Sequence, residues 1–153
     1  MDFIISQFSS GWSPVCFEAA GKKLEMDVSY CRDSFTEIAD GLLFLWNNES
    51  GVQHIYFDLE ADGWVHLLMI NYPEGLLKLE FYKDVLWFDI GEDDENPLPV
   101  LSFVTTLHQF AYLFCREMNK HGEDGYGGWG HSFPALQLKQ LKNKMLPPSR
   151  FPK

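Results

Sequence analysis

Six residues near the C-terminus carry the pattern that comes closest to a cofactor-binding motif. Residues 125–130 read Gly-Tyr-Gly-Gly-Trp-Gly and match G-x-G-x-x-G. A dinucleotide-binding loop of this form follows a strand and opens a helix whose N-terminus binds pyrophosphate. Here a helical pattern precedes the glycines, and few residues follow to build a second strand. We therefore predict no cofactor and a packed loop in which Tyr126 and Trp129 anchor the last helix. The alternative is a loop that binds a partner, since Tyr and Trp are frequent binding anchors.

Histidine is the residue most often used as a general base or metal ligand, and its spacing here fits neither role. The five are His54, His66, His108, His121 and His131, and neither H-x-x-x-H nor H-E-x-x-H occurs. His121 and His131 flank the glycine loop and could meet Glu123 or Asp124 at a metal ion, but surface or capping roles are the default. We expect His108, on an apolar helix, to be a hydrogen-bonded core residue, and we predict no metal site.

Paired carboxylates are the next candidates for chemistry. Asp58 and Glu60 share one face of an expected strand, and Asp62 follows in the turn. Such a group could perform acid–base catalysis or bind a cation. Alternatively, it is the solvated face of an antiparallel sheet and needs no chemistry. No P-loop or nucleophile elbow occurs in the sequence, so we predict no catalytic residue.

The cysteines and the N-terminus bear on the cellular compartment. Cys16, Cys31 and Cys115 are odd in number and form no C-x-x-C pair, which argues against a disulfide framework or a zinc site. We expect mostly buried thiols that pack as small apolar groups. The first residues lack the basic and apolar stretches of a secretory signal, and no apolar run approaches the roughly 20 residues of a membrane span. These features predict a cytoplasmic protein without a membrane segment.

Charge is distributed unevenly along the chain. The net charge is −10 and the pI about 4.8, which disfavours nucleic-acid binding because phosphate would be repelled. Residues 33–95 carry a net charge of −13, whereas residues 139–153 carry +5. The densest acidic run is Glu92, Asp93, Asp94 and Glu95. It is either a solubilising loop or a surface that steers a basic partner into contact.

Hydrophobic periodicity predicts the elements that position these residues. Residues 15–20 and 22–30 alternate apolar and polar side chains and indicate a hairpin around Gly21. Ser34 and Glu37 fit a capping box for a helix over 34–46. Residues 52–60 and 64–71 predict a second hairpin around an Asp-Gly turn, and residues 76–82 and 85–90 predict two further strands.

The pattern changes to helical spacing after Pro99. Residues 101–118 predict a long helix that is apolar on most sides, and residues 134–145 a short amphipathic one. The expected fold is α+β: one antiparallel sheet of five to six strands packed by the long, mostly buried C-terminal helix. The capped helix and the short terminal helix complete one domain over residues 1–146, followed by a loose basic tail over 147–153. The predicted core comprises Leu24, Met26, Val28, Ile55, Phe57, Leu107, Phe110 and Phe114.

This order of elements resembles that of a known class of proteins. The capped helix over 34–46 leads into Tyr-Phe-Asp-Leu-Glu-Ala-Asp-Gly-Trp at residues 56–64. The tail over 125–134 reads Gly-Tyr-Gly-Gly-Trp-Gly-His-Ser-Phe-Pro. In layout these features are similar to those of small acidic bacterial immunity proteins, which neutralise polymorphic or contact-dependent-inhibition toxins. The resemblance implies an α+β protein that binds a toxin domain in the cytoplasm and needs no catalytic residue.

Charge and resemblance together favour a protein that occludes the active site of a basic toxin, and the expected toxin is a nuclease. The expected contact residues are the acidic run 92–95, the acids Asp58, Glu60 and Asp62, and the aromatic pair Tyr126 and Trp129. Two alternatives stay open: a small enzyme with a His/carboxylate pocket, and a homodimeric adaptor. A pocket in which His and carboxylates converge would favour the enzyme, and a flat acidic face with exposed Trp or Tyr the inhibitor. The oligomeric state is left undetermined.

Overall fold

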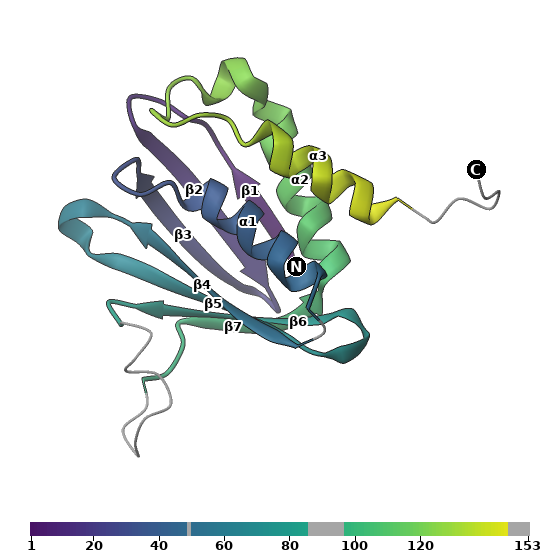
Figure 1. The fold of residues 1–153 in the computed structure, drawn as a ribbon. Helices are drawn as coiled ribbons and strands as arrows, with labels where there is room; N and C mark the ends of the chain where they lie inside the picture. Colours follow the sequence, from purple (N-terminus) through teal and green to yellow (C-terminus); the bar gives the residue numbers. More distant parts are fainter. Residues whose placement is uncertain (49, 86–96, 147–153) are drawn as a thin grey trace, which may run out of the picture.

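The computed structural model describes residues 1–48, 50–85 and 97–146 and forms two antiparallel sheets and three α-helices (Figure 1). The first sheet contains β1 (Asp2–Ile5), β2 (Trp12–Ala19) and β3 (Lys22–Ser29), in that spatial order. The second contains β4 (Gly51–Asp58), β5 (Trp64–Asn71), β6 (Leu76–Lys83) and β7 (Leu101–Thr106), also in chain order. The α+β class is confirmed, but the single sheet of five to six strands is wrong.

Both predicted hairpins are present. The β2–β3 turn uses Ala20 and Gly21, both at positive φ, as a two-residue hairpin turn requires. The β4–β5 connection is longer than an Asp-Gly turn, because residues Glu60–Asp62 form a 3₁₀ turn (η1) before Gly63. The predicted strand 85–90 lies almost entirely outside the described residues.

Strand β7 corrects the prediction of one long helix from residue 101. Leu101–Thr106 pairs with β6 in register from Phe81–Leu101 to Leu76–Thr106. Its run Phe-Val-Thr-Thr is rich in residues that favour strands, and pairing with β6 outweighs the helical spacing of its apolar positions. Helix α2 (Leu107–Tyr126) therefore starts six residues later than predicted, where the hydroxyl of Thr106 accepts from the N–H of Gln109.

Helix α1 (Ser34–Trp46) has the predicted bounds, but the predicted capping box is wrong. The Ser34 hydroxyl donates instead to the carbonyl of Tyr56 in β4, at 2.6 Å. The Glu37 carboxylate forms a two-pronged ion pair with Arg32. Gly41, which weakens the helix by itself, allows close packing, because a Cβ there would lie 2.8 Å from the Met69 side chain.

The core lies between the two sheets and the helices. Rings from both sheets and α2 meet in it: Phe17 lies 4.6 Å from Phe81, and Phe3 lies 6.1 Å from Phe110. Seven of the eight predicted core residues are buried, and Leu24 is partly buried against them. Helix α2 is less buried than predicted, since it exposes one side that includes Tyr112.

The three α-helices leave one face of the second sheet without a helix. Helices α1, α2 and α3 (Ala135–Met145) all lie on the same side of the β4–β7 sheet (Figure 1). Within the described residues, the opposite face of that sheet, its outer face, carries no helix. Among all the residues that the structure describes, no helix is long and apolar enough to cross a membrane.

Candidate functional site

The outer face of the β4–β7 sheet brings together side chains that are distant in sequence. The register aligns Tyr56, His66 and Tyr82 across β4, β5 and β6. The neighbouring row starts with His54, and the row beyond Tyr56 pairs Asp58 with Trp64. Sequence alternation could place each residue on a face, but only the strand pairing shows that they are neighbours.

Two histidines form the most unusual contact on this face. The ring nitrogens His54 Nδ1 and His66 Nε2 lie 2.8 Å apart. The imidazole of His66 is fully buried and stacks on the Tyr56 ring at 4.5 Å. Burial, and secondarily the neighbouring His54, lower the pKa of His66 to about 4. The sequence analysis did not predict this pair. The available signal was the alternation of side chains between the two faces of β4 and β5.

The aromatic row continues into a polar pair on β6. The hydroxyl of Tyr82 donates to Glu80 Oε2 at 3.0 Å. Burial, followed by this hydrogen bond and the charge of Glu80, raises the pKa of Tyr82 to about 12. A phenol with so high a pKa stays protonated at neutral pH and serves as a hydrogen-bond donor.

A shallow cavity of about 210 Å³ lies at one corner of the outer face. Arg32, Tyr56, Asp58 and Trp64 line it, and we call these four residues the aromatic notch. The guanidinium carbon of Arg32 lies 5.0 Å from the centroid of the Tyr56 ring, which is cation–π distance. The ring and the Glu37 carboxylate together hold this guanidinium, so the notch already accommodates a planar cation.

Of the three acids at the β4–β5 turn, Asp58 lines the notch, and Glu60 and Asp62 follow it in the turn. Asp58 Oδ1 accepts from the N–H of Glu60 at 2.7 Å and shapes the turn. Glu60 and Asp62 are exposed to solvent, and the thiol of Cys31 donates to Glu60 Oε1 at 3.4 Å. Glu60 and Asp62 are thus solvated turn residues, whereas the carboxylate of Asp58 is hydrogen-bonded to the backbone. The acidic run 92–95 lies outside the described residues.

The glycine loop is packed and does not present its aromatic residues to a partner. Tyr126 and Trp129 are buried, and both donate to Asp33 Oδ1, at 3.2 and 3.3 Å. Burial, with the Asp33 charge next, raises the pKa of the Tyr126 hydroxyl. A Cβ at Gly128 would lie 2.5 Å from the carbonyl oxygen of Phe8, so close backbone packing requires this glycine. The predicted packed loop is therefore confirmed, although Tyr126 and Trp129 are held by Asp33 before α1, and the alternative in which these two residues bind a partner is withdrawn.

The remaining histidines lie against backbone carbonyl oxygens, and the cysteines differ in burial. His121 Nε2 lies 2.7 Å from the Ile5 carbonyl oxygen, and His131 Nε2 lies 2.6 Å from that of Tyr30. His108 is exposed rather than buried as expected, with Nε2 3.3 Å from the Met145 carbonyl oxygen. Of the three cysteines only Cys115 is buried, where the expectation was burial of most of them. Among the described residues no three His, Cys, Asp or Glu side chains converge on a metal position.

The buried histidine predicts a specific pH dependence of stability. A folded-state pKa near 4 lies below the ordinary value of 6.5, so the unfolded chain binds the proton first. Stability contributed by neutral His66 is complete above pH 6.5 and is lost as the pH falls toward 4. We expect the free energy of unfolding to drop by roughly 1.5 kcal/mol between pH 6.5 and pH 5, above the range in which most carboxylates titrate.

Urea unfolding at several pH values measures this effect. His66→Gln should flatten the slope between pH 6.5 and pH 5, whereas His108→Gln, at an exposed histidine, should keep it. Parallel slopes for wild type and His66→Gln would show that His66 protonates freely in the folded protein.

The comparisons with known proteins found no related protein. No protein-family model matches the chain, and neither the search of curated proteins nor that of solved structures found a significant match.

Proposed function

We propose that this protein is a non-catalytic binding protein that recognises a basic protein partner through the aromatic notch, as an immunity-type inhibitor of a basic toxin would. The observation that carries the proposal is the partly exposed pair Tyr56 and Trp64 on a sheet face without a helix, next to the acidic turn. Partly exposed aromatic rings supply apolar contact area at little entropic cost, and Tyr and Trp dominate binding energy at protein interfaces.

The negative charge around the notch indicates which kind of partner would bind there. The notch includes Asp58, and Glu60 and Asp62 follow in the adjoining turn, in the stretch of the chain with the strongest negative charge. The guanidinium of Arg32 on Tyr56 is an intramolecular example of the contact that an arginine of the partner would make with Trp64. An acidic, aromatic surface therefore favours a partner that presents Arg or Lys, which is the surface of a nuclease-type toxin.

The first test is genetic and identifies the probe. We expect the neighbouring reading frame to encode a large secreted toxin, and its C-terminal domain should arrest growth unless this protein is co-expressed. A neighbouring toxin domain that this protein neither binds nor neutralises would contradict the proposal.

The second test separates steering from anchoring by measuring binding kinetics with that domain. Trp64→Ala should speed dissociation about tenfold or more, because it removes an anchor. Glu60→Gln with Asp62→Asn should slow association severalfold at 0.01 M salt and less at 0.15 M, because the screening length falls from about 30 to 8 Å. Amides at residues 92–95 should slow it about tenfold at low salt.

The matched control removes two charges from the other sheet. Glu25→Gln with Asp27→Asn alters two exposed acids of β3, and should leave both rate constants near their wild-type values. Association that is equally slowed by this control would mean that net charge alone, and not the notch, governs encounter.

A further inference from the structure

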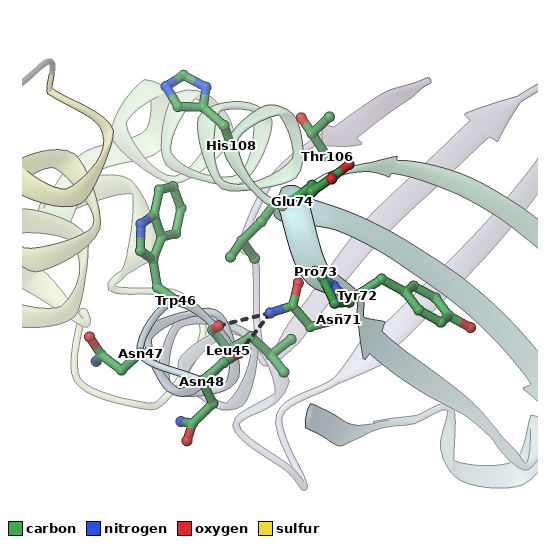
Figure 2. A pocket seen from close by; sticks show the side chains of 12 residues that line it. Leu45, Trp46, Asn47, Asn48, Asn71, Tyr72, Pro73, Glu74, Thr106 and His108 are labelled. Carbon is green, nitrogen blue, oxygen red and sulfur yellow. Dashed lines mark hydrogen bonds between the residues drawn. The ribbon is translucent and has the colours of Figure 1, made fainter. Parts of the chain in front are cut away.

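A cavity of about 670 Å³ lies at the opposite end of α1 from the aromatic notch. Three segments form its walls: the C-terminus of α1, the turn between β5 and β6, and the start of α2 (Figure 2). The indole of Trp46 stands on one side, next to His108, and Glu74 lies on the other side (Figure 2). The cavity is large enough for a small organic molecule and is unrelated to the partner-binding proposal.

Asn71, at the end of β5, is an under-satisfied polar residue of this cavity. It is 5% exposed, and its Nδ2 donates to the carbonyl oxygens of Leu45 and Asn48, at 3.0 and 2.9 Å. These two acceptors determine the orientation of the amide, since only the nitrogen can donate to them. Oδ1 therefore points away from α1, toward the turn that carries Pro73 and Glu74 (Figure 2), and it is buried without a hydrogen-bond partner.

The groups around Asn71 select a positively charged donor. The C-terminus of α1 carries the negative end of the helix dipole, and its carbonyl oxygens meet at this side chain. Glu74 adds a formal negative charge, and the Trp46 ring offers the aromatic surface with the strongest attraction for cations. The N-terminus of α2, which is the positive end of its dipole, lies on the facing wall. It is capped by Thr106, whose Oγ1 accepts from the Gln109 N–H at 3.0 Å.

We propose that this cavity is a binding site for a small organic cation, an ammonium or guanidinium group on an apolar body. The cationic N–H groups donate to Asn71 Oδ1 and face the carboxylate of Glu74, while the apolar body lies along Trp46 and Leu107. A buried acceptor left unpaired is costly, so a donor at this position gains more than one at the open surface. A carboxylate ligand would instead place two acceptors against Asn71 and Glu74.

Titration with three phenyl compounds of similar size tests the charge requirement. In ¹H–¹⁵N NMR spectra of the full chain, 2-phenylethylamine should shift the indole N–H of Trp46 and the side-chain amide of Asn71, and saturate in the millimolar range. We expect 2-phenylethanol, which can donate to Asn71 but has no charge, to bind at least tenfold more weakly. We expect no saturable shift with 3-phenylpropanoate. Equal affinities for amine and alcohol, or shifts elsewhere, would overturn the proposal.

A variant at the rim tests the site without disturbing the core. Glu74→Gln should weaken amine binding about three- to tenfold and leave the fold intact, because Glu74 is exposed. Glu60→Gln is the matched control, since Glu60 is also an exposed acid at positive φ in a turn, and it should leave amine affinity unchanged. Equal amine affinity in Glu74→Gln and wild type would contradict the proposed role of the Glu74 carboxylate in the site. A crystal structure grown with the amine that shows only water on Asn71 Oδ1 would overturn the inference as a whole.

Discussion

Trp129→Ala should lower the free energy of unfolding by about 3–5 kcal/mol, a large fraction of the stability of a domain this size. The indole is fully buried and packs edge-on against Phe35 at 5.0 Å and Phe8 at 5.7 Å. Its N–H also donates to Asp33 beside the start of α1. The substitution removes a large ring from a place where three distant segments meet, next to Gly128, which packs closely against the Phe8 backbone.

Urea unfolding monitored by circular dichroism measures this loss, and two other variants calibrate it. Trp12→Ala makes the same change at a ring that is 37% exposed, and should cost less than half as much. Trp129→Phe keeps most of the packing and loses the hydrogen bond, so an intermediate loss of about 1–2 kcal/mol is expected. Equal stability of Trp129→Ala and Trp12→Ala would mean that the glycine loop does not pack against α1.

Phe110→Ala should also cost about 3–5 kcal/mol and lower the melting temperature by roughly 10 °C. Phe110 lies in the first turns of α2 and is fully buried. Its ring is 6.1 Å from Phe3 in β1 and 6.3 Å from Phe17 in β2. Because Phe17 in turn contacts Phe57 and Phe81, loss of Phe110 opens a void where α2 meets both sheets.

Tyr112→Ala supplies the matched control on the same helix. Tyr112 is 52% exposed, so its truncation should change stability by less than about 1 kcal/mol. A melting temperature for Phe110→Ala within a few degrees of that of Tyr112→Ala would contradict the core assignment. Binding of 2-phenylethylamine should survive Tyr112→Ala, since that side chain does not line the cavity beside Trp46.

The variants Trp129→Ala and Phe110→Ala probe the packing of the core, whereas the two proposed sites lie at the surface. The aromatic notch and the cavity beside Trp46 share no lining residue, so each proposal can fail alone. Partner binding that depends on Trp64 but not on Glu74 would support the first proposal. Amine binding that depends on Glu74 but not on Glu60 would support the second.

Local patterns in the sequence determined most of the elements of this protein. Alternation identified both hairpins and β6, and helical spacing identified residues 34–46 to within the observed bounds. The buried faces were also readable, as Met26, Val28, Ile55 and Phe57 show. These features were accessible because they depend on neighbours within a few residues, where the periods of strand and helix differ clearly.

The tertiary structure alone decided how the elements pair and which side chains meet. Residues 101–106 carry a helical pattern, yet they become β7 because β6 offers a free edge. Ser34 fits a cap, yet its hydroxyl donates to a carbonyl of β4. Tyr126 and Trp129 are buried as the packed-loop prediction required, but both donate to Asp33, a contact that the sequence did not indicate. The contact between His54 and His66, the aromatic notch and the unpaired oxygen of Asn71 all arise from register and from the packing of distant segments. No local pattern records such contacts, because they are made only when the whole chain has folded.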